Sequence, residues 1–318
     1  MMFVHDDPDF EPLLRIVAEK RRLPVGLVEK DYWVTHSLWA LHAQGYDVWF
    51  KGGTSLSKGF GLIERFSEDL DLKVEPGRVE DIEPVKNWKS EGKKAIAERT
   101  AYFGKLAGQL AVPGATARLG PIEDPSFRSA NIQVLYPGRH ISSLTPALRP
   151  FVLLEVGSAR VTPHVARDMT SFVHEHLERE GLLVEFEDNR PRGIRCVHPL
   201  VTLLEKLDAL MRRFPRIDAV PATFVRHFED AARIVRSRSL PPLPGYTNVR
   251  ALAEEMLAQR QIAALPSRAH PALAPADDGL WREVLEANEA NAPMYWGPRL
   301  SLEDSCAELR AWIAAEFE

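Results

Sequence analysis

Apolar side chains recur at steps of three and four residues in several stretches of the chain. This spacing places them along one face of a helix, so each stretch predicts a helix. The first covers residues 25–44 and ends before Gly45, and a lysine-rich one covers residues 84–110. The later ones cover 198–213, 221–238, 248–263 and 302–317, and Pro199 stands where a proline favours the first turn of a helix.

A second pattern, in which apolar and polar residues alternate, is typical of strands with one buried face. It covers residues 46–50 and 69–74, and between them lie Lys51-Gly52-Gly53 and a short helix predicted over residues 54–66. The local order is therefore helix, strand, Gly-Gly turn, helix, strand. Further strands are predicted over residues 130–136, 151–156 and 182–187.

These elements divide the chain near Arg192. Strands are predicted only before this point, whereas the four later patterns are all helical. We predict an α+β fold in which residues 1–191 form an α/β lobe around a small mixed sheet and residues 192–318 form a helical lobe. The proline-rich stretches 240–244 and 266–275 are predicted to be loops within the helical lobe.

Composition narrows the class of protein. The 318 residues are 45% hydrophobic and 27% charged, which is typical of globular proteins large enough for two domains. Two cysteines, Cys196 and Cys306, are too few for a disulfide scaffold or a cysteine-based zinc site, and they suit a reducing compartment. No run of eighteen apolar residues occurs, so we expect a cytoplasmic protein without a membrane partner.

The charge distribution bears on partners. The chain carries a net charge of −5, which does not favour a polyanionic partner. Between Arg192 and Arg238, however, ten Lys or Arg residues stand against five Asp or Glu residues. This basic stretch could hold the phosphodiester backbone of an RNA, although solvated arginines on amphipathic helices would give the same count.

The strongest candidate for chemistry lies around the Gly-Gly turn. Glycines after a strand let a backbone approach a phosphate closely, and the N–H groups at a helix start favour an anion. Asp69 and Asp71 are two apart on a predicted strand, so both point to one face with Cα atoms about 6–7 Å apart. Two such carboxylates can hold a magnesium ion. Taken singly, a Gly-Gly pair is usually a turn, and Asp-x-Asp is usually the solvated face of a strand.

A strand, Gly-Gly, a helix and then Asp-x-Asp on the next strand resemble the polymerase-β-like nucleotidyltransferases. Lys51-Gly52-Gly53-Thr54-x-Leu56 together with Arg65-Phe66-Ser67-Glu68-Asp69-Leu70-Asp71-Leu72 is similar to the AbiEii or MenT branch, the toxins of type IV toxin–antitoxin systems. Fifteen residues separate Gly53 from Asp69, as is usual in that branch. Residues 29–34, 201–213 and 226–230 resemble further family motifs, whereas residues 77–145 match none.

The resemblance implies catalytic roles for five residues. Asp69 and Asp71 would hold Mg²⁺ or Mn²⁺, and Glu155 on a neighbouring strand would be a third ligand or the base for the attacking hydroxyl. Lys206 would neutralise the triphosphate, and Asp230 would orient Lys206 or the substrate. Three of these residues also have ordinary explanations, which are a charged strand end for Glu155, a stem along apolar surface for Lys206, and an ion pair with Arg226 for Asp230.

The resemblance also implies a set of residues that bind the nucleotide, and both lobes contribute to it. Lys58 could equally be a solvated helix residue, and Arg65 and Ser67 could order the turn instead. The set comprises Lys51, Gly52, Gly53, Thr54, Ser55, Lys58, Arg65, Ser67 and Lys206.

The implied activity is magnesium-dependent transfer of NMP from an NTP to the 3′ hydroxyl of an RNA, with release of pyrophosphate. The family points to the tRNA acceptor stem, where a blocked end would stop translation, and to a cognate antitoxin from a neighbouring gene. Three alternatives stay open. The same chemistry could act on a protein or small-molecule hydroxyl, the fold could serve a non-catalytic nucleotide-binding regulator, or the chain could be a plain RNA-binding module.

Overall fold

The computed structural model describes residues 1–67, 69–144, 148–214, 216, 218 and 220–318. The chain forms two compact units. Unit 1 comprises Met1–Gly59, Glu68–Val161 and Ala166–Cys196, and unit 2 comprises Phe60–Ser67, Thr162–Val165 and Val197–Glu318. The short segment Phe60–Ser67, which lies between two elements of unit 1 in the sequence, therefore belongs to unit 2.

An eight-stranded sheet has the strand order β3-β4-β5-β6-β2-β1-β8-β7. Strands β1 and β2 pair antiparallel, whereas β2 with β6 and β1 with β8 pair parallel, so the sheet is mixed as predicted but larger than the small sheet we expected. The strands are β1 (Asp47–Lys51), β2 (Asp69–Glu75), β3 (Ala111–Val112), β4 (Ala115–Leu119), β5 (Ser129–Leu135), β6 (Val152–Gly157), β7 (His164–Arg167) and β8 (Ile194–Val197).

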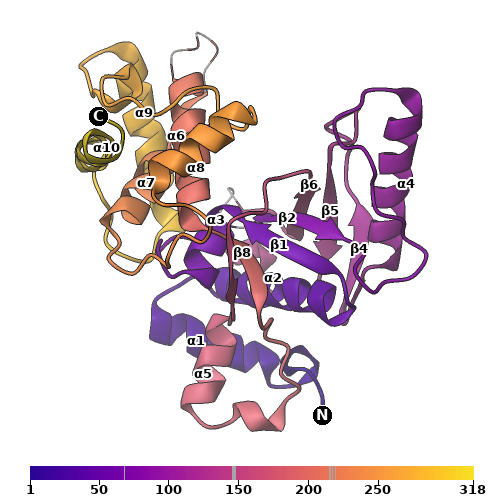
Figure 1. Ribbon diagram of the computed structural model, residues 1–318. Helices are drawn as coiled ribbons and strands as arrows, with labels where there is room; N and C mark the ends of the chain where they lie inside the picture. The colour runs from indigo at the N-terminus through magenta and orange to yellow at the C-terminus, as the bar shows by residue number, and fades with distance from the viewer. Residues whose placement is uncertain (68, 145–147, 215, 217, 219) are drawn as a thin grey trace. The chain divides into compact units, whose positions relative to one another are not determined.

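The central strands have one buried and one half-exposed face. In β1 and β2 the residues alternate between buried and half-exposed, because successive side chains point to opposite faces. Phe50, Leu70 and Leu72 lie on the buried face and are at most 1% exposed. Helix α2 (Val25–Ala43) contacts β1 and β6 and lies beside the sheet (Figure 1).

The other helices of unit 1 are α1 (Phe10–Arg21), α4 (Lys93–Gln109) and α5 (Phe172–Arg179), together with the short α3 (Gly52–Thr54). Helices α1, α2 and α5 contact one another, and α4 contacts β4 near the end of the sheet (Figure 1). Tyr102 of α4 donates a hydrogen bond to the carbonyl of Val74 at 2.6 Å, which ties this helix to β2.

Unit 2 is built mainly from helices. Helix α7 packs against both α6 and α10, and the buried stripe Leu203, Leu207 and Leu210 of α6 is fully covered. His198 caps α6 by accepting a hydrogen bond from the N–H of Leu200, and Pro199 follows in the first turn as predicted. The helices are α6 (Pro199–Arg213), α7 (Arg226–Arg236), α8 (Val249–Ala258), α9 (Gly279–Ala290) and α10 (Leu302–Phe317).

The helix predicted over residues 54–66 is wrong in its extent. Helix α3 continues as a single π-helical turn, Ser55–Gly59, and the next residues leave the helix. The N–H of Phe66 donates to the carbonyl of Met294, and the N–H of Trp296 donates to that of Glu64. This backbone therefore pairs with a distant segment of unit 2, which local periodicity does not reveal.

Two other predictions need correction. The helix predicted over residues 84–110 begins only at Lys93, because the buried guanidinium of Arg99 donates hydrogen bonds to the carbonyls of Asn87 and Ser90 and holds that segment outside the helix. The strand predicted over residues 182–187 is a 3₁₀ turn, Leu183–Glu185, in which Val184 is 82% exposed. Our prediction also omitted α1 and α9 and the strands β3, β4, β7 and β8, the last of which follows Arg192.

Candidate active site

Four polar residues stand side by side across the half-exposed face of the sheet. The strand register places Lys51 of β1 opposite Asp71 of β2, Asp71 opposite Glu155 of β6, and Glu155 opposite Asn131 of β5. Asp69 lies on the same face as Asp71, two residues earlier on β2. The third carboxylate predicted from the sequence therefore lies on the strand adjacent to the Asp-x-Asp pair.

The Gly-Gly turn touches this row directly. Gly52 has a φ of +75°, and a Cβ placed on it would lie 1.7 Å from Oδ2 of Asp71. Only glycine leaves room for the carboxylate here, and only glycine adopts this backbone angle readily. The hydroxyl of Thr54 donates a hydrogen bond to the carbonyl of Asp69 at 2.7 Å, so the turn of α3 is fixed to the start of β2. Gly53, Thr54 and Ser55 are buried.

The carboxylates of the row affect one another. Burial, together with the charges of Asp71 and Asp69, raises the pKa of Glu155 to about 8. A side-chain hydrogen bond with Asp71 adds to the effect, whereas the charge of Arg149 opposes it. At neutral pH Glu155 is therefore mostly protonated and shares its proton with Asp71.

Arg149, which sequence reasoning missed, holds one of the aspartates. Its Nη1 donates to Oδ1 of Asp69 at 2.7 Å, and its side chain is 45% exposed. The carbonyl of Arg149 accepts a hydrogen bond from Lys30, which is completely buried in α2. No motif signals this residue in the sequence, because it stands alone before β6 and reaches Asp69 only through the fold.

The donor chemistry of the row suits a hard divalent cation. Asp69, Asp71 and Glu155 offer only oxygen atoms, and after burial the charges of Asp71 and Asp69 are the next causes of the raised pKa of Glu155, so a cation here would offset their repulsion. Among the described residues, however, no three His, Cys, Asp or Glu side chains converge as a ready metal centre. The metal-ligand roles of the three carboxylates therefore remain predictions.

The predicted nucleotide ligand Lys58 has a different neighbour. Its ammonium lies 2.5 Å from Oδ1 of Asp31 and donates to the carbonyl of Thr170 at 3.0 Å. The side chain is only 11% exposed. The geometry assigns Lys58 a buried ion pair that fastens the π-helical turn to α2, and nucleotide binding by this amine stays a prediction.

Asp31 belongs to a run of three buried charged residues on α2. Glu29, Lys30 and Asp31 are each at most 2% exposed. The carboxylate of Glu29 accepts hydrogen bonds from the N–H groups of Arg139 and His140, both at 2.9 Å. Each residue of this motif thus holds a separate loop of unit 1, which explains why charged residues interrupt an otherwise apolar helix.

A second cluster of predicted site residues lies inside unit 2. Asp230 of α7 accepts two hydrogen bonds from the guanidinium of Arg65, each 2.7 Å long, and a third from Nζ of Lys206 at 2.8 Å. Asp230 is fully buried, Arg65 is 3% exposed and Lys206 is 7% exposed. The partners of Asp230 are therefore Arg65 and Lys206 rather than Arg226, and the expected contact between Asp230 and Lys206 is present.

Two cations share one carboxylate in this cluster. Burial alone would raise the pKa of Asp230, but the charges of Arg65 and Lys206 outweigh it and hold that pKa far below its usual range. Nδ1 of His227 lies 3.4 Å from Nζ of Lys206. Burial and the charge of Lys206 keep the pKa of His227 well below its ordinary value, so the imidazole is neutral. The cluster therefore retains a net positive charge.

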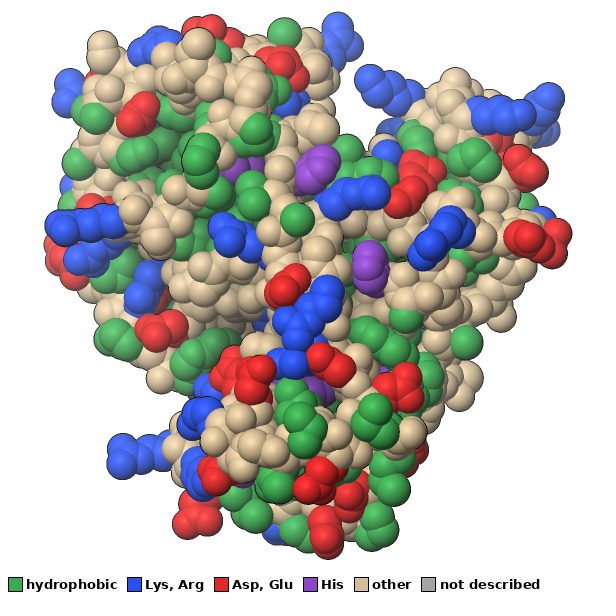
Figure 2. Space-filling model, turned by 60° about the horizontal axis from the view of Figure 1, so that its bottom comes forward, with side chains coloured by type: hydrophobic (Ala, Val, Ile, Leu, Met, Phe, Trp, Pro, Cys, Tyr) green, Lys and Arg blue, Asp and Glu red, His purple; other side chains and the backbone are tan. Residues whose placement is uncertain are grey.

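Most of the basic stretch between Arg192 and Arg238 is already paired. Figure 2 shows basic and acidic side chains interspersed over the face that it presents. The local charge count therefore overstates the positive potential of this stretch. Ion pairs with Asp or Glu engage Arg192, Arg195, Lys206, Arg212, Arg216, Arg233 and Arg236.

The comparison with known families agrees with the motifs. Residues 37–301 match the family described as nucleotidyl transferase AbiEii toxin of type IV toxin–antitoxin systems. The chain belongs to the AbiEii family. The match covers most of the chain, and it confirms the AbiEii resemblance seen around Lys51 and Asp69. Searches of curated proteins and of solved structures gave no match. In the described part of this AbiEii-family chain, no helix has the length and apolar character needed to cross a membrane.

The predicted site residues of this AbiEii-family chain fall into two groups. Unit 1 holds the three carboxylates of Asp69, Asp71 and Glu155. It also holds Lys51, Gly52, Gly53, Thr54, Ser55 and Lys58, whereas unit 2 holds Arg65, Ser67, Lys206 and Asp230. That both groups serve one site stays a prediction.

Proposed function

We propose that this protein is a magnesium-dependent toxin that transfers NMP from an NTP to the 3′ end of an RNA, namely the tRNA acceptor stem. Membership of a nucleotidyltransferase toxin family supports the transfer chemistry. The observation that carries the proposal is the register of Asp71 with Glu155 on adjacent parallel strands, with Asp69 on the same face. Carboxylates so placed suit phosphoryl transfer better than they suit a passive binding surface.

In this proposal each group has a defined task. The N–H groups of the Gly52–Gly53 turn and the ammonium of Lys206 bind the triphosphate, while Asp69, Asp71 and Glu155 hold Mg²⁺ or Mn²⁺. The bound metal ion supplies charge neutralisation on the phosphate oxygens. The 3′ oxygen of the acceptor forms a bond to the α-phosphorus as the bond to pyrophosphate breaks. Glu155 must first be ionised, because its pKa of about 8 leaves it mostly protonated at neutral pH, and in the ionised form its carboxylate accepts the proton of that hydroxyl.

The biological consequence follows from the acceptor. A tRNA with an extra nucleotide at its 3′ end cannot be charged with an amino acid, so translation stops and the cell ceases to grow. A protein with this activity requires an antitoxin, which we expect from a neighbouring gene, as the type IV family implies.

The test is a labelled-nucleotide assay run with each NTP separately. Purified tRNA and total cell protein are offered in turn as acceptors, with and without magnesium. We expect label in tRNA, dependent on magnesium and absent from the Asp69→Asn, Asp71→Asn double variant. Glu75→Gln is the matched control, because Glu75 lies on the same strand and face but outside the row. Label in protein and none in RNA would refute the proposed acceptor.

A further inference from the structure

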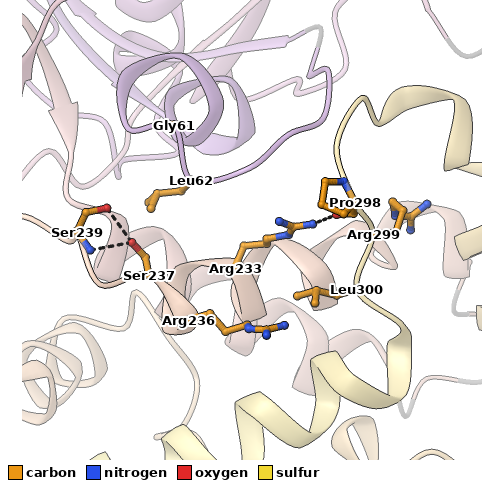
Figure 3. Close-up of a pocket in the computed structure, with 9 residues that line it drawn as sticks. All are labelled: Gly61, Leu62, Arg233, Arg236, Ser237, Ser239, Pro298, Arg299 and Leu300. Atoms are coloured by element: carbon orange, nitrogen blue, oxygen red, sulfur yellow. Dashed lines mark hydrogen bonds between the residues drawn. The ribbon is translucent and has the colours of Figure 1, made fainter.

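Unit 2 contains a pocket of about 460 Å³ that is separate from the Asp230 cluster. Three segments that are distant in the sequence form it (Figure 3). They are the C-terminal turn of α7 with the residues after it, the Gly61–Leu62 stretch, and the Pro298–Leu300 stretch before α10. None of the described residues that line it is acidic. The lining residues are Gly61, Leu62, Arg233, Arg236, Ser237, Ser239, Pro298, Arg299 and Leu300.

Two of the three arginines are fixed before any ligand arrives. Glu229 is 4% exposed, and its carboxylate accepts from Arg299 at 2.6 Å and from Arg233 at 3.1 Å. Arg233 also donates to the carbonyl of Pro298, and Arg299 stacks 3.7 Å from the ring centre of Tyr295. One buried carboxylate thus orders two guanidinium groups, and the exposed carboxylate of Glu64 lies 3.9 Å from Nη1 of Arg233 as a second, looser counter-charge.

The third arginine is held more loosely. Arg236 is 49% exposed, and its Nε lies 3.6 Å from Glu308, which is itself 40% exposed. A long, solvated ion pair of this kind is weak and can be exchanged for another anion. Ser237 and Ser239, on the segment that follows α7, also line the pocket, and their hydroxyls lie 3.2 Å from each other.

The helix alone does not account for this arrangement. Arg233 and Arg236 lie in the last turn of α7, where cations offset the negative end of the helix dipole. That effect does not explain why Arg299 and two serine hydroxyls from other segments meet the same hollow. Guanidinium groups and hydroxyls around a hollow with no acidic lining residue are the donors that phosphate oxygens prefer, and Leu62 and Leu300 add apolar surface suited to a sugar.

We propose that this pocket binds a phosphate group of an RNA backbone, as a docking site for the acceptor. The choice of RNA rests on the proposed function, whereas the choice of a phosphate rests on the lining residues. Arg236 and the two serines contact the phosphate, and the fixed guanidinium groups of Arg233 and Arg299 complete the lining around it. A phosphate contact of this kind positions an RNA without reading its sequence.

The first test measures the binding of fluorescently labelled tRNA to the full chain at several salt concentrations, without NTP or metal. We expect Arg236→Gln to weaken binding about three- to tenfold and to lower the slope of log affinity against log salt by about one. Arg282→Gln is the matched control, because Arg282 is also exposed and lies 3.7 Å from an exposed carboxylate, that of Asp277, but outside the pocket. Equal binding by the two variants would overturn the proposal.

A second pair of variants changes only charge. Gly61 has a φ of +62°, which Asp and Asn tolerate better than other side chains, and a Cβ there meets no atom within 4 Å. Gly61→Asp should weaken tRNA binding relative to Gly61→Asn, and equal affinities would count against the pocket. Because these assays need no transfer, the outcome is independent of the labelled-nucleotide assay. Pocket-dependent binding without transfer would refute the proposed function alone, and transfer with unchanged binding by all variants would refute the pocket alone.

Discussion

The carboxylate of Asp71 lies directly over the Cα of Gly52, at a point where a Cβ would come within 1.7 Å of Oδ2. A single atom of β2, Oδ2 of Asp71, therefore excludes any side chain at Gly52, where β1 leads into the glycine turn. We expect Gly52→Ala to displace Asp71 and to lower nucleotide transfer at least about a hundredfold, since small misplacements of reacting groups have effects of this size.

A control separates this clash from backbone strain. Gly181 has a φ of +74°, nearly the same as that of Gly52, but a Cβ there meets no atom within 4 Å. Gly181→Ala should therefore cost only about 1 kcal/mol of unfolding free energy and leave transfer intact. Equal activity of the two variants in the labelled-nucleotide assay would show that the contact between Gly52 and Asp71 is unimportant.

Removal of the carboxylate from the unit 2 cluster should destabilise the protein strongly. Asp230→Asn leaves Arg65 and Lys206 buried without their counter-charge, which typically costs about 3–5 kcal/mol. Urea denaturation measures this change directly. A variant as stable as the parent would mean that water already solvates the cluster.

Lys206→Met tests function within the same cluster. The variant keeps both hydrogen bonds between Arg65 and Asp230, so its loss of stability should stay below about 2 kcal/mol. If Lys206 neutralises the triphosphate, transfer should nevertheless fall by about a hundredfold or more. Steady-state kinetics with varied NTP, compared with urea denaturation of the same sample, distinguishes the two roles.

For Lys58, in contrast to Lys206, we expect a role in stability rather than in nucleotide transfer. Its ion pair with Asp31 is nearly buried, so Lys58→Met should lower the unfolding free energy by about 3 kcal/mol. In a double-mutant cycle with Asp31→Asn, the coupling energy should exceed about 1 kcal/mol. A raised KM for NTP in a variant of unchanged stability would instead support the nucleotide-binding role implied by the family resemblance.

Acid should destabilise unit 1 through a buried histidine network. Asn189 links His36 and His174 through hydrogen bonds of 2.7 Å each, and burial lowers the pKa of His36 to about 3 and that of His174 to about 4. In the unfolded chain both protonate near pH 6.5, so the stability that they contribute is complete above that pH and is lost as the pH falls toward 4. The slope should approach about 1.4 kcal/mol per pH unit for each histidine.

Thermal unfolding across pH 4–8 tests the network. In His36→Gln the decline below pH 6.5 should be shallower, because one of the two groups no longer titrates. His42→Gln, which changes an exposed residue at the end of the same helix, should retain the full decline. The same slope in both variants would place the acid sensitivity elsewhere.

Magnesium binding should release protons if Glu155 is a ligand. With a pKa of about 8, the group carries a proton at pH 7 that a cation would displace. Titration calorimetry in two buffers of different ionisation enthalpy measures the protons released. Glu155→Gln should abolish the buffer dependence, and a release that persists in this variant would exclude Glu155 as the source.

Sequence periodicity identified the elements that carry their own local signal. Helix α10 runs from Leu302 to Phe317 as predicted, and β2 spans the predicted alternation with one more residue. The neighbouring position of Glu155 was predicted as well, because a family pattern supplied the pairing. Predictions failed where distant groups decide the conformation. The carbonyl of Met294 accepts a hydrogen bond from the N–H of Phe66, and Arg99 donates to a carbonyl before α4.

The electrostatic partners were harder still to predict. Nothing in the spacing of Asp230 points to Arg65, which lies 165 positions earlier, and an ion pair four residues away was the natural interpretation. The same holds for Lys58 with Asp31 and for Arg149 with Asp69. Sequence reveals which residues carry charge, but the pairing of those charges depends on packing between remote segments.

The membership of Phe60–Ser67 in unit 2 limits how the chain can be divided. A fragment that begins at Val197 would contain Lys206 and Asp230 but would lack Arg65, which donates two of the three hydrogen bonds accepted by the buried carboxylate. A fragment that ends at Cys196 would expose that arginine segment without its partner. No single cut in the chain yields two fragments that each contain a complete unit. We therefore expect only the undivided chain to fold with the Asp230 cluster intact.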